Sequence, residues 1–77
     1  YRDDRYRAVV SRMPLIQQIR RETRESGESL AAYVTRQVDA CLAEGILTLV
    51  GEPDPQATRG RWIREVTAVF RTHSRRR

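Results

Sequence analysis

The chain has 77 residues, of which 39% are hydrophobic and 32% are charged, and its net charge is +5. This length leaves room for one small domain with a limited core. No apolar run approaches the roughly 20 residues of a membrane-spanning helix. A single cysteine excludes an internal disulfide and a cysteine-based zinc site. Because the chain begins at Tyr1, we expect residues 1–77 to form one domain of a longer protein.

The positive charge comes entirely from arginine and is unevenly distributed along the chain. All fifteen cations are arginines. The net charge is +3 over residues 1–27, −2 over residues 28–50 and +4 over residues 51–77, which include a basic tail at 71–77. Guanidinium groups bind phosphate bidentately and stack on bases, so two basic ends favour an anionic partner. Codon usage in a GC-rich gene would also replace lysine with arginine.

The first third of the chain has a helical rhythm that a proline interrupts. Apolar residues recur at steps of three and four between Tyr6 and Ile19. Pro14 cannot donate a backbone hydrogen bond and disfavours helix at the preceding residue. We therefore expect two helical pieces, 4–12 and 14–25, that are either kinked or separated by a turn. The N-cap of the first piece would be one of two acids, Asp3 or Asp4.

The central segment carries the clearest helical signal. Ser29 is a favourable N-cap residue, and the apolar stripe that follows it predicts a helix over 29–44. Gly45 suits the left-handed residue just after such a helix, with Ile46 packing back near Cys41. Cys41 lies within the stripe, so we expect a buried, unreactive thiol and no catalytic nucleophile.

The apolar run 46–50 is either a buried strand or an extra helical turn, because periodicity does not distinguish the two for so short a segment. Prolines and a glycine end it. We expect the last helix to span about 58–73 with Thr58 as its N-cap, while Asp54–Pro55 is the competing start. The expected core consists of ten residues: Ile16, Ile19, Leu30, Val34, Val38, Leu42, Leu49, Trp62, Val66 and Phe70.

Together these elements predict an all-α fold of three to four helices, with a short β-hairpin at 46–50 and 61–67 left open as an alternative. The hairpin comes from a resemblance. The segment TRQVDACLAEGIL, residues 35–47, resembles the end of the recognition helix in winged helix-turn-helix proteins. In that family the recognition helix leads into a wing made of two strands.

The winged-helix resemblance extends over residues 35–67 and implies a specific arrangement. Residues 46–52 and 61–67 would be the two wing strands, and 53–60 would be the tip. The helix at 14–25 would precede the recognition helix. The function that the resemblance implies is DNA binding.

Arginine clusters are the candidate nucleic-acid contacts. Trp62 lies among three of them and would either stack on bases or anchor the core, and its helical spacing from Val66 and Phe70 favours the core. The expected nucleic-acid-binding residues are Arg20, Arg21, Arg24, Arg59, Arg61, Arg64, Arg75, Arg76 and Arg77.

The sequence gives little support for catalysis. Its four glycines are dispersed, so no phosphate-binding loop is present, and His73 lies in the basic tail. We expect no enzymatic activity, no metal and no cofactor. The favoured function is a regulatory nucleic-acid-binding module inside the cell, in the cytoplasm, nucleus or nucleoid, with DNA favoured over RNA and no membrane association. The alternative is an interaction or assembly domain that binds itself or an acidic protein.

Overall fold

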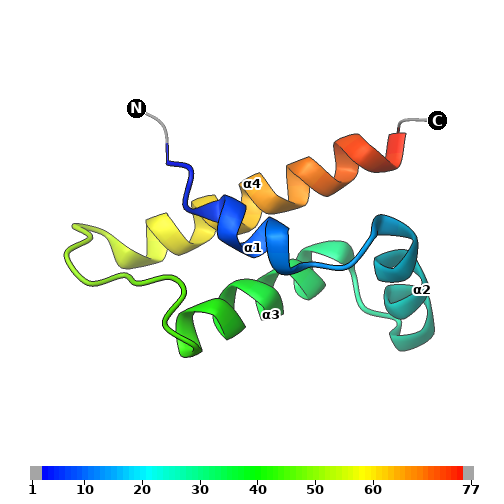
Figure 1. Ribbon diagram of the computed structural model, residues 1–77, viewed down its shortest axis with the longest axis horizontal. Coiled ribbons are helices and arrows are strands. Elements are labelled where there is room, and N and C mark those ends of the chain that lie inside the picture. The colour runs from blue at the N-terminus through cyan, green and yellow to red at the C-terminus, as the bar shows by residue number, and fades with distance from the viewer. Residues whose placement is uncertain (1–2, 76–77) are drawn as a thin grey trace.

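The computed structural model describes residues 3–75, with side chains described for 3–72, and within that part it is all-helical. The helices are α1 (Tyr6–Arg12), α2 (Ile16–Ser26), α3 (Leu30–Ala43) and α4 (Pro55–Arg75) (Figure 1). The predicted all-α class is confirmed. The wing hairpin is wrong: residues 46–50 form no strand, and residues 61–67 lie inside α4.

The longest helix, α4, organises the others. Its 21 residues give it a length of about 31 Å. Helix α3 makes the most extensive contact with it, α1 crosses both, and α2 lies at one end of the molecule (Figure 1). No helix in residues 3–75 combines the length and apolar character that are needed to cross a bilayer.

Pro14 separates the first two helices. Met13 and Leu15 on either side of it have extended backbone conformations, so an extended connection replaces the kink that was the alternative. Helix α1 begins at Tyr6, after an N-cap residue, Arg5, that makes no capping side-chain bond. The expected cap at Asp3 or Asp4 is therefore wrong, and the Asp3 carboxylate has another function that is described below.

Helix α3 begins and ends by side-chain and backbone capping. The Ser29 hydroxyl accepts a hydrogen bond from the Ala32 amide at 3.1 Å, as expected for an N-cap. At the other end, Gly45 has a φ of +78°, and the Ile46 amide donates to the Cys41 carbonyl at 3.0 Å. These are the bonds of a Schellman ending, in which glycine takes the left-handed position.

Helix α4 begins at Pro55, so the competing start is confirmed and the Thr58 start is wrong. The Asp54 carboxylate accepts a hydrogen bond from the Ala57 amide at 3.2 Å. Proline suits the first helical position because its missing amide hydrogen would have no partner there. Thr58 is buried inside the helix and donates its hydroxyl to Glu52 at 2.9 Å.

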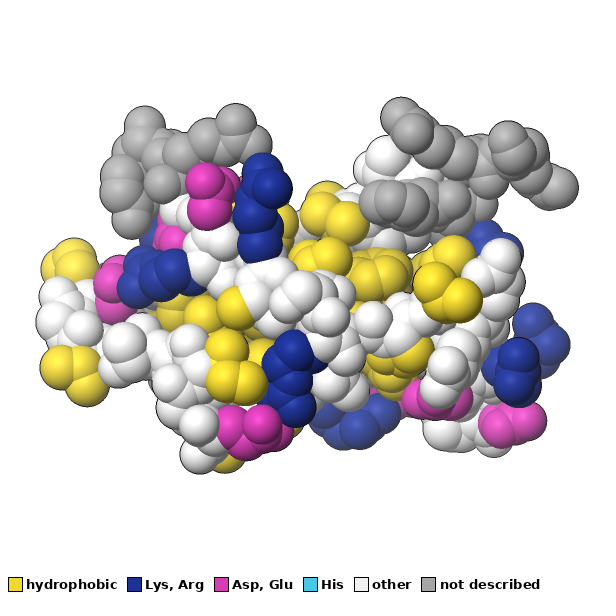
Figure 2. All heavy atoms as spheres, in the orientation of Figure 1, with side chains coloured by type: hydrophobic (Ala, Val, Ile, Leu, Met, Phe, Trp, Pro, Cys, Tyr) yellow, Lys and Arg dark blue, Asp and Glu magenta, His cyan; other side chains and the backbone are white. Residues whose placement is uncertain are grey.

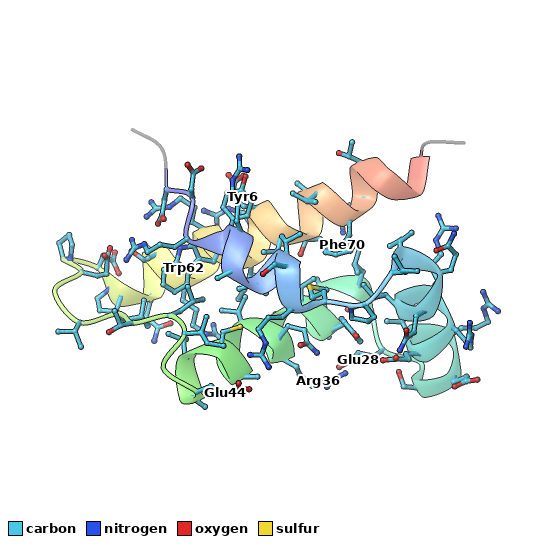
Figure 3. The ribbon with its side chains drawn as sticks, in the orientation of Figure 1. Tyr6, Glu28, Arg36, Glu44, Trp62 and Phe70 are labelled. Carbon is cyan, nitrogen blue, oxygen red and sulfur yellow. The ribbon has the colours of Figure 1, made fainter. Side chains whose placement is uncertain are left out.

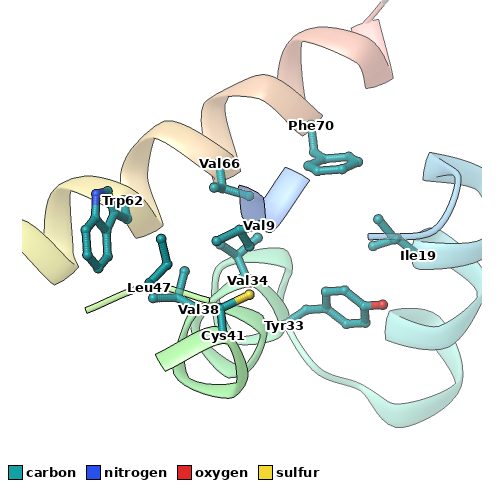
Figure 4. Packing of buried hydrophobic residues seen from close by; sticks show 10 residues of the cluster. All are labelled: Val9, Ile19, Tyr33, Val34, Val38, Cys41, Leu47, Trp62, Val66 and Phe70. Carbon is teal, nitrogen blue, oxygen red and sulfur yellow. The ribbon is translucent and has the colours of Figure 1, made fainter. Parts of the chain in front are cut away.

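The core runs along the inner face of α4 (Figure 4). Six of the expected residues are buried there: Ile19, Val34, Val38, Trp62, Val66 and Phe70. Four others that were expected in the core are only partly buried against it: Ile16, Leu30, Leu42 and Leu49. The remaining buried members are Val9, Tyr33, Cys41 and Leu47. At the α2 end, Ile19 faces Phe70 and Tyr33, so α2 reaches the core mainly through one side chain (Figure 4).

Two glycine substitutions should have opposite effects on stability. Gly45→Ala should lower the free energy of unfolding by about 1 kcal/mol, because a side chain is strained at a positive φ even though no atom would collide with it. Gly60→Ala should raise it by about 0.5–1 kcal/mol, because Gly60 is an ordinary helical residue whose new methyl group would meet only the Arg64 side chain at 3.5 Å. Thermal unfolding followed by circular dichroism measures both, and equal signs would contradict the α3 ending.

The Cys41 thiol should react only when the protein unfolds. Its residue is 2% exposed, and the Arg12 guanidinium lies 3.6 Å from the sulfur. Labelling by an aromatic disulfide reagent under native conditions should be far slower than in denaturant. Equal rates in the two conditions would place Cys41 outside the core and shift the register of α3.

Candidate nucleic-acid interface

Trp62 is completely buried, and its indole nitrogen is hydrogen-bonded to Asp3, near the beginning of the chain. The Nε1–H group donates to the Asp3 carboxylate at 3.0 Å, across 59 residues of sequence. Asp3 also accepts bonds from the Arg5 amide at 3.0 Å and from the Arg5 guanidinium at 2.9 Å. A buried indole N–H needs an acceptor, and Asp3 supplies one.

Arg5 connects this carboxylate to the loop that precedes α4. Its guanidinium lies 5.0 Å from the centre of the Trp62 ring, which is a cation–π geometry, and its Nη1 lies 3.0 Å from the Glu52 carboxylate. Glu52 in turn accepts the Thr58 hydroxyl. Three segments that are distant in sequence are therefore joined by one network around the tryptophan, which we call the Trp62 network: Asp3, Arg5, Glu52, Thr58 and Trp62.

The network shifts the ionisation of its acids toward the charged form. Hydrogen bonds from Arg5 hold the pKa of Asp3 far below its usual range, with a further contribution from Trp62 and an opposing one from burial. The pKa of Glu52 is also lowered, first by Arg5 and then by Thr58. Both carboxylates are therefore charged at neutral pH, and they stabilise the fold as anions.

This geometry removes the base-stacking role considered for Trp62. A ring that is 0% exposed cannot stack on a base, so the core interpretation is confirmed. Two of its neighbouring arginines are held in ion pairs. Arg59 binds Asp39 through two hydrogen bonds of 2.8 and 2.9 Å, and the Arg61 guanidinium lies 3.6 Å from Asp3. Both guanidinium groups therefore contact acids of the chain itself, and nucleic-acid binding by these two residues stays a prediction.

Further ion pairs explain the uneven charge along the chain. Arg36 binds Glu28 bidentately at 2.8 Å, and Arg12 lies 3.1 Å from Glu44 (Figure 3). With the Asp39–Arg59 pair, each acid of the mildly acidic middle segment is bound by an arginine. The acids of the middle segment and the arginines that bind them therefore form ion pairs within the folded chain.

The three arginines of α2 are arranged differently. Arg20, Arg21 and Arg24 are exposed on one short helix, and neither Arg21 nor Arg24 makes an ion pair with any described residue. Beside them lies a shallow polar hollow of about 420 Å³ lined by Arg20, Thr23, Arg24, Gly27 and Glu28. We call the surface formed by Arg20, Arg21 and Arg24 the α2 basic face. Two residues of the first predicted cluster, Arg20 and Arg24, line the hollow, and Arg21 does not.

The outer face of α4 carries two further exposed arginines. Arg64, which was predicted, and Arg71, which was missed as a site residue, are exposed and make no ion pair in the described part of the chain. Their seven-residue spacing places them on one side of the helix and could have revealed the pair. The side chains of Arg75, Arg76 and Arg77 lie outside the described residues.

No metal-binding cluster accompanies these arginines in the part of the chain that the structure describes. The described residues contain no group of three or more histidine, cysteine or acidic side chains placed to hold a metal ion. Three of the described acids, Glu28, Asp39 and Glu52, are instead bound to arginines or a hydroxyl.

Asp3→Asn should lower the free energy of unfolding by about 2–3 kcal/mol, because it removes charge-assisted bonds to Arg5 and a strong acceptor from Trp62. In the wild type, stability should fall as the pH drops below about 4, since the unfolded chain then binds a proton at Asp3 that the folded chain does not. Asn should flatten this acid branch. Denaturation followed by Trp62 fluorescence measures both effects.

The matched control is Asp4→Asn, which removes the same charge from an exposed neighbour whose contact with Arg7 is 3.6 Å long. It should change stability by less than about 0.5 kcal/mol. Equal losses from the two substitutions would contradict the assignment of the network to Asp3.

No protein-family model, curated protein or solved structure matches the chain.

Proposed function

We propose that the protein binds nucleic acid through backbone phosphates, and that the α2 basic face is the principal contact. The observation that carries the proposal is the difference between two groups of arginines. Arg5, Arg12, Arg36 and Arg59 are fixed by internal carboxylates, whereas Arg21 and Arg24 are exposed without one. Figure 2 shows exposed dark-blue side chains at the end of the molecule where α2 lies, with magenta acidic side chains beside them.

The available side chains favour phosphate contacts over base contacts. Tyr33, Trp62 and Phe70 are buried and Tyr6 is partly buried, so the described part of the chain offers no fully exposed ring for stacking. Binding of single strands relies largely on such stacking. A surface of arginines without aromatic rings suits a duplex, and DNA is favoured over RNA because specific RNA recognition usually involves unstacked bases.

Helix α2 is a better candidate contact than α3. The two helices are joined by a three-residue turn, Gly27–Ser29, in which Gly27 has a φ of +74°. In a helix-turn-helix unit the second helix enters the groove. Arg36 and Asp39 of α3, however, are both held in ion pairs, so this helix presents no unpaired cation to DNA. The terminal Arg75, Arg76 and Arg77 join the proposal on their charge alone.

Binding to a 20-base-pair duplex should fall at least ~100-fold between 50 and 200 mM salt if about four to six phosphates are contacted. The double substitution Arg21→Gln and Arg24→Gln should make the slope of log affinity against log salt less steep by about two units. Fluorescence anisotropy of a labelled duplex measures both.

The control removes the same charge from α1 through Arg7→Gln and Arg12→Gln, whose guanidinium groups already lie beside acids. It should leave the slope within about half a unit of the wild type. An equal decrease in both variants would show that only net charge matters. Absence of duplex binding at 50 mM salt would refute the function itself.

A further inference from the structure

A groove on the far side of α4 from the α1 contact is not used by the proposed nucleic-acid site. It has a volume of about 490 Å³ and lies between the start of α3 and the C-terminal half of α4. Its lining residues are Ala31, Ile63, Arg64, Thr67, Ala68, Arg71 and Thr72. Most of them are small or apolar, and the Thr67 hydroxyl already donates to the Ile63 carbonyl at 2.7 Å.

Two unpaired cations accompany this apolar lining. Arg64 and Arg71 are exposed and make no ion pair with the described residues. They are seven residues apart on one helix, which corresponds to two turns and about 10 Å along its axis. The groove therefore offers apolar contact together with two positive charges at a fixed separation.

We propose that this groove binds an acidic amphipathic helix of a partner protein. The groove follows α4 from Ile63 to Thr72, a length of about 13 Å, which accommodates two to three turns of a helix lying alongside. Ala31 and Ala68 permit close approach of a second backbone, since interhelical distance depends on side-chain size at the contact. Carboxylates two turns apart on the partner would reach Arg64 and Arg71.

The charge and the lining select this occupant over two others. A sugar–phosphate strand that covered Ile63 and two alanines would lose the hydration of its polar groups without gaining hydrogen bonds there. A second copy of the chain would bring the same Arg64 and Arg71, or the arginines of α2, toward a surface that is already positive. An acidic helix with an apolar ridge complements both features.

The test uses a labelled helical peptide of about 16 residues, with alanine and leucine on one face and two glutamates seven residues apart beside it. A control peptide of identical composition carries the glutamates on the opposite face. The first peptide should bind at low salt at least ~10-fold more tightly than the second. Arg64→Gln with Arg71→Gln should remove that preference.

Two further variants separate the groove from net charge and from the nucleic-acid site. Ala68→Tyr, at an exposed position, should fill the groove and weaken peptide binding at least ~10-fold without changing charge. Arg21→Gln with Arg24→Gln should leave peptide binding unchanged while it weakens duplex binding.

Equal affinity for the two peptides, or no effect of Ala68→Tyr, would overturn the inference. It would also be overturned if the substitutions at Arg64 and Arg71 weakened only duplex binding, because the groove would then be a nucleic-acid surface. That last outcome would add α4 to the duplex contact, whereas the two peptide outcomes leave the α2 basic face unaffected, because its test uses a duplex and different residues.

Discussion

The buried indole of Trp62 is the constraint on which the rest of the structure depends. The ring is completely buried in the hydrophobic core, and its nitrogen must still find an acceptor. Asp3 is that acceptor, and Arg5 neutralises it while covering the ring. The segment before α1 is consequently fixed on α4, and α1 is held in place to contribute Val9 to the core.

The same chemistry explains how a chain with so many arginines folds with so few acids. Three of the ion pairs join different parts of the molecule: Arg12 of α1 with Glu44, Arg59 of α4 with Asp39 of α3, and Arg5 with Glu52. Exposed pairs of this kind contribute little individually, and their main effect is to specify which faces meet. The arginines that remain outside these pairs define the surface open to an anionic partner.

The helices and much of the core could be predicted from the sequence, because both follow from local chemistry. Ser29 and Gly45 marked the ends of α3, and Pro14 marked the break between α1 and α2. The wing was wrong because its strands were inferred from a resemblance, whereas the period of Trp62, Val66 and Phe70 was helical.

The candidate site was predictable only in part. The α2 cluster is contiguous in sequence and therefore visible in it. The pairing of Arg59 with Asp39, and of Trp62 with Asp3, depends on residues 20 and 59 positions apart, which no local pattern encodes.

The network that joins Asp3 to Trp62 also bears on the order in which the chain folds. Closing a loop of 59 residues from an unstructured chain costs about 3–4 kcal/mol in entropy. The turn between α2 and α3 closes only three residues. Contacts between near neighbours in sequence are therefore favoured early, and the attachment of the first residues to α4 is favoured as a late step. The completed tryptophan site thus reports that residues 3–5 and α4 have reached their native positions relative to each other.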